Sequence, residues 1–223
     1  MSSPVTYHDR SDAGRRLAEE LGAYVRRADV QVYGIPRGGV PVAWEVAVRV
    51  EAPLDVVVVR KLGLPVQPEL AMGAIASGGI RFLNSDVLDL GVSSRTVEEV
   101  TRRETIELKR RERLYRGGIP ALDPGGKTAI LVDDGLATGS TMRAAIASVR
   151  ARGAAAVVVA VPVGAASTCA EIERESDAFF CPLRRTDFMA VGEWYEDFRQ
   201  TTDDEVRDLL ERSRKGVQPA GRR

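Results

Sequence analysis

Residues 128–150 constrain the fold more than any other part of the sequence. They read Thr-Ala-Ile-Leu-Val-Asp-Asp-Gly-Leu-Ala-Thr-Gly-Ser-Thr and continue as an alanine-rich segment. The apolar residues 128–132 are typical of a buried strand. The alanine-rich segment is typical of a helix, and Arg152-Gly153 is a good signal for its end. The stretch therefore predicts a strand, a short loop and a helix in succession.

The loop of this unit carries groups that suit a phosphorylated ligand. Asp133 and Asp134 follow the strand directly, at the carboxyl edge where parallel sheets hold ligands. The small and hydroxylic residues after them leave helix N–H groups open to an anion, which the helix dipole also favours. We expect a phosphate on the residues here called the second loop, which are Ala137, Thr138, Gly139, Ser140 and Thr141. A neighbouring ligand group with hydrogen-bond donors, such as a ribose diol, would face the two carboxylates. The alternative is that Asp133 caps the helix and the glycines only make turns.

Residues 132–141 resemble the phosphoribosyl pyrophosphate (PRPP) signature of the type I phosphoribosyltransferases. The signature consists of apolar residues, two acids, a variable pair and Thr-Gly-Gly/Ser-Thr, and this chain has Val-Asp-Asp-Gly-Leu-Ala-Thr-Gly-Ser-Thr. The resemblance implies that Asp133 and Asp134 bind the ribose hydroxyls and that residues 137–141 bind the 5-phosphate. It also implies Mg²⁺, bridging pyrophosphate and ribose oxygens, with the two aspartates contributing indirectly through ribose and water.

A second strand, turn and helix precede this unit. Residues 30–35 are predicted to form the strand and residues 41–50 the helix, and residues 36–39 are here called the first loop. Its two glycines, Gly38 and Gly39, let the backbone approach an anion, and Arg37 offers a fork of donors to phosphate oxygens. The loop resembles the pyrophosphate loop of the same family, which implies a non-proline cis peptide within it. The alternative is a plain turn with a solvated arginine.

A third apolar run, residues 54–59, reads as a buried strand that ends at Arg60 and Lys61. Family members place a basic residue here, so the resemblance implies that Lys61 reaches the pyrophosphate; the alternative is a solvated lysine. Residues 62–84 are rich in Gly and Pro, predict a hairpin, and correspond in order to the family's loop that closes over PRPP. Glu69 in this segment either folds over the site or is a surface acid.

The remaining pattern alternates strands with helices, which predicts right-handed crossovers and a parallel sheet. The fold expected is α/β, a doubly wound, mainly parallel sheet with a small C-terminal hood. The expected helices cover residues 9–25, 94–115, 165–175 and 203–210, and the expected strands include 155–161 and 178–180. We expect an α/β PRPP-binding core in residues 1–180, an aromatic-rich hood in 181–213 and a disordered tail in 214–223.

Aromatic residues gather in residues 181–200, here called the aromatic segment, although the chain is otherwise poor in them. In the family, a hood of this kind binds the base, so Trp194 and Tyr195 are candidates to stack on a heterocycle. The alternative is that they only seal the edge of the sheet.

Composition narrows the ligand class. Thirty-two basic and thirty-two acidic residues leave no net charge, so no global field attracts nucleic acid or a membrane. Cys169 and Cys181 suggest neither a disulfide framework nor a zinc site, and His8, the only histidine, removes His-based triads. Without a signal-like or membrane-length apolar run, a soluble, cytoplasmic protein is expected. The expected partners are PRPP and a small nitrogenous base, and a homodimer stays open.

The predicted activity is Mg²⁺-dependent transfer of the ribosyl 5-phosphate of PRPP to a nitrogenous base, with release of pyrophosphate. Some 6-oxopurine enzymes of the family carry an acid where this chain has Ala137, so a general base would come from elsewhere, with Glu69 as a candidate. The acceptor is left open. The alternative is a regulator that senses PRPP or nucleotides with the same fold and no turnover.

Overall fold

The computed structural model describes residues 6–65, 67–83 and 91–216, and for residues 68–71 it describes the backbone alone. Within these residues, five parallel strands form a central sheet in the order β2-β1-β6-β7-β9. Their bounds are Val30–Gly34 for β1, Leu54–Val56 for β2, Thr128–Val132 for β6, Ala156–Ala160 for β7 and Ala178–Phe180 for β9. The α/β fold with a mainly parallel sheet, predicted from the sequence, is confirmed.

The strand order contains a switch point between β1 and β6. These two strands are neighbours, with Gly34 level with Val132. The chain nevertheless passes from β1 to β2 on one side and from β6 to β7 on the other. Ligand sites in open α/β sheets occur at the carboxyl ends of the strands at such a point. The first loop and the aspartate pair, Asp133 and Asp134, both begin there.

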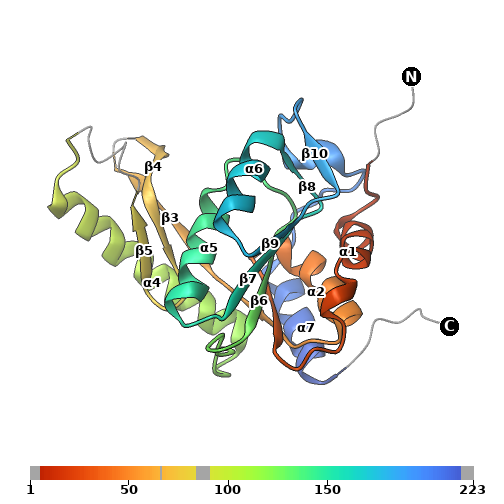
Figure 1. Cartoon of the computed structure of the whole chain (residues 1–223). Coiled ribbons are helices and arrows are strands. Elements are labelled where there is room, and N and C mark those ends of the chain that lie inside the picture. Colours follow the sequence, from red (N-terminus) through yellow and green to blue (C-terminus); the bar gives the residue numbers. More distant parts are fainter. Residues whose placement is uncertain (1–5, 66, 84–90, 217–223) are drawn as a thin grey trace.

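Helices cover both faces of the sheet, with α2 and α7 on one face and α5 and α6 on the other (Figure 1). Val32 and Ile130 belong to the hydrophobic core under the first pair of helices, and Tyr33 and Leu131 belong to the core under the second. Successive strand residues point to opposite faces, so each strand supplies both cores. The bounds are Gly39–Val50 for α2, Ser140–Ala151 for α5, Ala166–Glu175 for α6 and Asp203–Arg214 for α7.

The first helix is shorter than predicted. α1 spans Arg10–Glu19, and a short 3-10 helix, η1, follows at Gly22–Tyr24. Asp9 caps α1, because its carboxylate accepts a hydrogen bond from the backbone N–H of Asp12 at 2.7 Å. The helix therefore begins one residue after the start of the predicted range and ends well before Val25.

Strands β3, β4 and β5 form a separate antiparallel sheet that projects from the core together with α4; we call these four elements the arm (Figure 1). The predicted hairpin is confirmed, since β4 and β5 pair across a turn at residues 77–79. Gly78 and Gly79 have φ values of 86° and 77°, which favour glycine. The bounds are Val59–Leu64 for β3, Gln67–Ala76 for β4, Ile80–Leu83 for β5 and Ser94–Arg116 for α4.

The predicted single strand over residues 54–59 is in fact divided. The N–H of Val57 still donates to the carbonyl of Gly34 in the parallel sheet, at 3.2 Å. One residue later, Val58 exchanges hydrogen bonds with Ser77, through its N–H to the Ser77 hydroxyl and through its carbonyl to the Ser77 N–H, both at 2.9 Å. The chain thus changes from a parallel to an antiparallel partner, although Val57 and Val58 stay buried. Lys61 therefore lies within β3 of the arm and not just beyond a strand of the main sheet.

Three short elements that follow β7 along the chain, β8, β10 and η2, form a small addition at the carboxyl edge. β8 and β10 pair in parallel, and the short helix η2 follows. Cys169 and Cys181 are free, with their sulfur atoms 3.8 Å apart. The bounds are Val163–Ala165 for β8, Leu183–Arg185 for β10 and Val191–Trp194 for η2.

The remaining predicted elements are close to the observed ones. α4, β7, α6 and β9 agree with the predicted ranges within one residue at each end. α7 begins at the predicted residue but continues past Leu210 to Arg214, and Lys215 follows as its cap. Of the tail predicted for 214–223, residues 217–223 lie outside the described residues.

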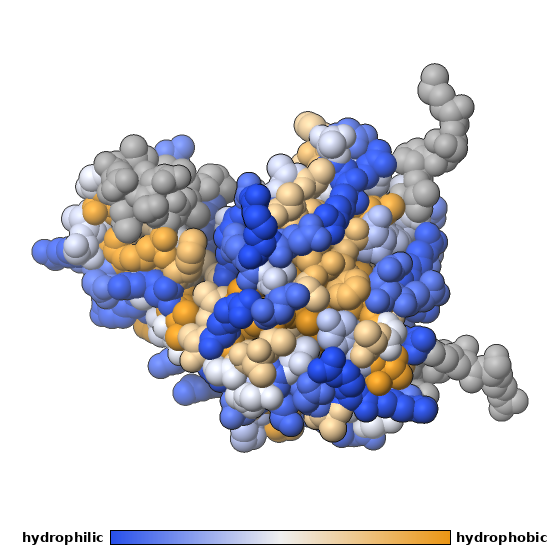
Figure 2. Space-filling model, viewed as in Figure 1, coloured by the Kyte–Doolittle hydropathy of each residue, from blue (hydrophilic) through white to orange (hydrophobic). Residues whose placement is uncertain are grey.

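Hydrophilic and apolar residues are interspersed on the face shown in Figure 2. Two of the exposed large apolar side chains, Phe82 and Ile106, lie on β5 and α4 of the arm. The arm therefore buries its apolar side chains less completely than the sheet, whose central strand β6 is buried along its whole length.

Candidate functional site

The first loop and the aspartate pair touch at the switch point. Ile35, between β1 and the first loop, donates its N–H to the Val132 carbonyl at 2.9 Å. A Cβ added at Gly39 would lie 2.7 Å from that carbonyl oxygen and 2.9 Å from Oδ1 of Asp133, and a Cβ at Gly38 would collide with Oδ2 of Asp134. Glycine is therefore required at both positions for the loops to approach this closely.

The first loop contains a cis peptide bond between Pro36 and Arg37, which confirms the prediction of a non-proline cis bond there. The Arg37 guanidinium lies 3.7 Å from Oδ1 of Asp203, at the start of α7, and its side chain is one-third exposed. This distance is longer than a hydrogen bond. Arg37 can therefore turn towards a ligand at the first loop without breaking a tight pair.

The two aspartates lie next to each other, so the negative charge of one disfavours the ionised form of the other. Oδ1 of Asp133 accepts the N–H of Asp134 at 2.9 Å, and Oδ2 of Asp134 accepts a hydrogen bond from Nε of Arg10 at 2.8 Å. Burial and the neighbouring Asp134 carboxylate raise the pKa of Asp133 well above its usual range. Burial also raises the pKa of Asp134, while Arg10 opposes the shift. Perturbed acids at a strand end are typical of functional sites.

Hydrogen bonds to two of its backbone carbonyls hold the second loop, and its hydroxyl side chains are exposed. The Thr168 hydroxyl donates to the Ala137 carbonyl at 2.7 Å, and Arg143 donates to the Thr138 carbonyl at 3.2 Å. Gly139 has a φ of 76°, and a Cβ there would lie 2.8 Å from Cγ2 of Thr168. α5 begins at Ser140 without a side-chain cap. The loop therefore presents a helix N-terminus with exposed hydroxyls from Thr138, Ser140 and Thr141, an arrangement that suits an anion.

Two predicted residues lie on the arm. Lys61 is exposed in β3, opposite Ala74 of β4. Glu69 belongs to β4, and its side chain lies outside the described residues. The arm leaves the main sheet at the carboxyl end of β2, next to β1, so it starts on the same edge as the aspartate pair.

The predicted hood aromatics pack against the protein. The Tyr195 ring lies 5.6 Å from the Tyr7 ring and 5.0 Å from the Phe198 ring, measured between centroids. Its hydroxyl donates to the Asp134 carbonyl at 2.6 Å. Trp194 is also buried, with the Arg185 guanidinium 4.5 Å from its ring centroid. Stacking on a base stays a prediction, whereas the contact of Tyr195 with the aspartate pair is a feature of the structure.

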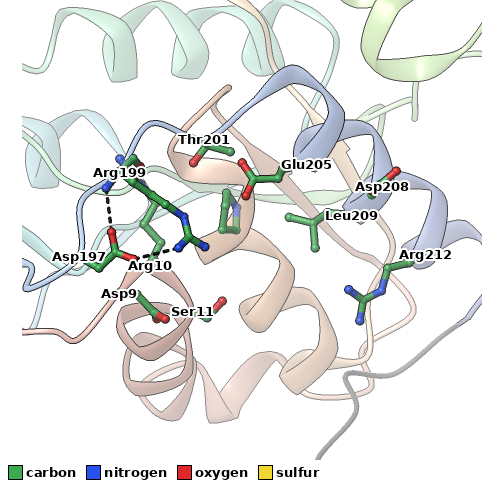
Figure 3. Close-up of a pocket in the computed structure, with 11 residues that line it drawn as sticks. Asp9, Arg10, Ser11, Asp197, Arg199, Thr201, Glu205, Asp208, Leu209 and Arg212 are labelled. Carbon is green, nitrogen blue, oxygen red and sulfur yellow. Dashed lines mark hydrogen bonds and ion pairs between the residues drawn. The ribbon is translucent and has the colours of Figure 1, made fainter.

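Arg10 is the residue at this site that sequence reasoning missed. It stands 124 positions before Asp134, in the first turn of a helix with two other arginines, so no local signal distinguishes it. Arg10 also lines a pocket of about 280 Å³ between the start of α1 and α7 (Figure 3). Asp197 and Arg199 form an ion pair at one end of this pocket. Arg10 thus adjoins both the pocket and the aspartate pair.

The sequence matches the phosphoribosyl transferase domain family over residues 6–196, so the chain belongs to that family. It is 46% identical over 216 residues to a Mycobacterium tuberculosis H37Rv protein provisionally named a phosphoribosyl transferase, Rv0571c, and equally to its counterpart in strain CDC 1551. The match covers 96% of this chain and 48% of the relative, so the chain spans about half the length of these relatives.

A solved structure has the same fold over nearly the whole chain. The crystal structure of TT1426 from Thermus thermophilus superposes with a TM-score of 0.80 at 40% identity, and covers 92% of this chain and 97% of that one. The family resemblance identified from residues 132–141 is therefore confirmed. Among the described helices, none is long and apolar enough to cross a membrane.

Proposed function

We propose that this chain binds PRPP and transfers its ribosyl 5-phosphate to a nitrogenous base with release of pyrophosphate. The observation that carries the proposal is the meeting of two loops at the switch point of a phosphoribosyl transferase domain. The aspartate pair lies against the glycines of the first loop. The second loop follows the pair along the chain and presents the N-terminus of α5. PRPP carries a ribose diol between a pyrophosphate and a 5-phosphate, which matches this succession of groups.

Each part of the ligand has a counterpart in the site. The aspartate pair accepts hydrogen bonds from the ribose hydroxyls, and the N–H groups and hydroxyls of the second loop bind the 5-phosphate. The pyrophosphate lies on the first loop. Its oxygens accept hydrogen bonds from the backbone N–H of Gly38 and from the side chains of Arg37 and Lys61, while the absence of a side chain at Gly39 lets the loop lie against Asp133.

The reaction needs little covalent chemistry from the protein. The bond between the sugar C1 and a pyrophosphate oxygen breaks, its electron pair leaves with the pyrophosphate, and the lone pair of the base nitrogen forms the new bond to C1. Positive charge develops on the sugar ring in the transition state, and the fixed carboxylates of Asp133 and Asp134 stabilise it. Binding both reactants in one orientation supplies the remainder of the rate enhancement.

Magnesium fits this site. Two neighbouring carboxylates with raised pKa values favour a cation beside them. The described residues contain no group of three or more His, Cys, Asp and Glu side chains able to hold a metal. Mg²⁺ is usually bound through one or two carboxylates, substrate phosphates and water, so Asp133 and Asp134 would be the residues to hold it. When bound, Mg²⁺ supplies neutralisation of the negative charge on the pyrophosphate.

The acceptor is a small nitrogenous base. Trp194 and Tyr195 lie in the segment that would cover it, and Glu69 on the arm is the candidate general base, because the second loop has Ala137 in place of an acid. The packing of both aromatic rings against protein favours one further candidate, a PRPP-sensing regulator without turnover.

The test is pyrophosphate release from PRPP and Mg²⁺ with a panel of purine and pyrimidine bases. The enzyme proposal predicts release that requires one of the bases and yields the matching nucleotide. Binding of PRPP without release across the panel would support the regulator. Absence of PRPP binding would overturn both.

A further inference from the structure

Arg10 is held by three contacts, one of which is with the aspartate pair. Nε donates to Oδ2 of Asp134 at 2.8 Å, and a terminal nitrogen donates to the Arg199 carbonyl at 2.7 Å. The guanidinium carbon lies 3.9 Å from the centroid of the Phe198 ring. The side chain is 11% exposed. A guanidinium held by a carboxylate, a carbonyl and an aromatic face has little freedom to move, because its donors form a rigid planar fork.

Two contacts hold Asp134, and each connects it to residues in the C-terminal part of the chain. Arg10 holds the side-chain oxygen, and the Tyr195 hydroxyl holds the backbone carbonyl at 2.6 Å. The Tyr195 and Phe198 rings pack on each other with centroids 5.0 Å apart. The position of the Asp134 carboxylate is therefore linked to residues 195–199 by two routes.

The oxygen that Arg10 holds is also limited by the first loop. A Cβ at Gly38 would overlap Oδ2 of Asp134 and would lie 3.1 Å from Nε of Arg10. Oδ2 of Asp134 thus lies against both Arg10 and Gly38, with no room for a further atom at Gly38. Loss of the guanidinium would remove the hydrogen bond that holds Oδ2 of Asp134 and would leave the carboxylate free to turn.

We propose that Arg10 is a positioning residue of the site: it fixes the Asp134 carboxylate for the ribose hydroxyls and connects it to the segment 195–199. The role rests on the proposed PRPP binding. Arg10 acts through Asp134 and does not touch the reacting atoms. It makes the orientation of the ribose-binding carboxylate depend on the packing of Phe198.

The chain offers a matched control on the same helix. Arg16 pairs with Asp12 at 2.8 Å and lies 5.4 Å from the Tyr7 ring centroid, so it also joins a carboxylate to an aromatic ring. Arg16→Met removes a similar set of contacts away from the aspartate pair. Arg10→Lys retains a cation near Asp134 but loses the planar fork, and Phe198→Leu removes the ring while leaving Arg10 in place.

The experiment is isothermal titration calorimetry of these variants with Mg²⁺ and three ligands: PRPP, ribose 5-phosphate and inorganic pyrophosphate. In Arg10→Met, we expect the affinity for the two ribose ligands to fall about tenfold or more, the effect of losing a charged hydrogen bond, while pyrophosphate affinity is unchanged. Arg10→Lys should restore part of the loss, Phe198→Leu should reproduce part of it, and Arg16→Met should bind all three ligands like the wild type.

The outcomes separate this inference from the proposed function. Equal losses for all three ligands, or no loss for the ribose ligands, would overturn the positioning role while PRPP binding by the wild type stands. If the wild type bound no PRPP, the proposed function would fail, and a crystal structure of Arg10→Met would decide the inference. An Asp134 carboxylate turned away from its wild-type position would then support it, and an unmoved carboxylate would refute it.

Discussion

Two arginine–aspartate contacts occupy different regions of this molecule, one inside the fold and one at the switch point. The first joins Arg116 at the end of α4 to Asp55 in β2, with Nε 2.9 Å and 3.2 Å from the two carboxylate oxygens. Arg116 also donates to the Val56 carbonyl at 2.8 Å, and Asp55 also accepts the Leu122 N–H at 2.9 Å. Both side chains are buried, and the protein itself supplies the partners of the carboxylate.

The second contact joins Arg10 to Asp134, and there the arrangement is less complete. Asp134 shares its surroundings with a second carboxylate, Asp133, which makes no ion pair within the described residues. Both aspartates are half-buried, and both have raised pKa values. The comparison teaches that a carboxylate whose partners all come from the protein stabilises the fold. The carboxylate pair at the sheet edge has fewer positive partners from the protein, and the proposed function assigns a ligand to it.

The largest expected effect is on the internal pair. Arg116→Met leaves the buried Asp55 without its cation, so we expect the free energy of unfolding to fall by about 3–5 kcal/mol. Urea denaturation followed by circular dichroism measures it. Arg16→Met, which breaks an exposed pair, is the control and should cost about 1 kcal/mol or less. A loss for Arg116→Met as small as that of the control would show that the two regions do not differ as described.

A smaller effect is expected where the first loop meets the aspartates. Gly38→Ala places a methyl group on Oδ2 of Asp134 and displaces that carboxylate, so PRPP affinity should fall about tenfold. Gly22→Ala is the matched control, because nothing lies within 4 Å of a Cβ there. Calorimetric titration with Mg²⁺ and PRPP measures both variants. Equal affinities for the two would mean that contact between the first loop and Asp134 is not needed for the ligand.

The smallest expected effect is on how the contribution of the aspartate pair to folding stability depends on pH. The pKa of Asp133 is raised in the folded protein, so the folded state holds this proton more tightly than the unfolded chain. The stabilisation of the folded state by this proton is fully present below the usual aspartate pKa of about 3.9. It is lost as pH rises through the raised pKa of Asp133. Asp133→Asn cannot titrate, so the stability of this variant relative to wild type should increase as pH rises through that window. Each kcal/mol gained raises Tm by about 2–4 °C.

Thermal unfolding at several pH values measures this difference. The comparison with wild type cancels the titrating groups that do not interact with Asp133, whereas the neighbouring Asp134 contributes to the measured difference. A stability difference that is constant with pH, or that declines as pH rises, would contradict the raised pKa of Asp133.

The sequence predicted the secondary structure that carries the candidate site, because that structure depends on local order. The strand, acid pair, small residues and helix of residues 128–151 follow one another directly, so periodicity and residue type were sufficient. The strand break at Val57 and Val58 could not be predicted, because both residues are apolar and only a change of hydrogen-bonding partner marks it. Placing Lys61 on the arm required that information.

The contacts that join distant segments could not be predicted either. Arg10 and Asp134 are 124 residues apart, and Tyr195 reaches the Asp134 carbonyl from 61 residues away. An arginine in the first turn of a polar helix is typical of a solvated surface, and a tyrosine in an aromatic cluster is typical of packing. Only the folded chain shows that both hold the same aspartate.

The proposed function depends on the aspartate pair, which has few positive partners within the protein, binding a ribose phosphate. The most direct measurement is calorimetric titration of PRPP with Mg²⁺ into the wild type and into the double variant Asp133→Asn, Asp134→Asn. We predict saturable binding to the wild type and a loss of affinity of at least about tenfold in the double variant, since hydrogen bonds to charged groups are removed. Equal binding to both proteins, or no heat with the wild type, would contradict the claim.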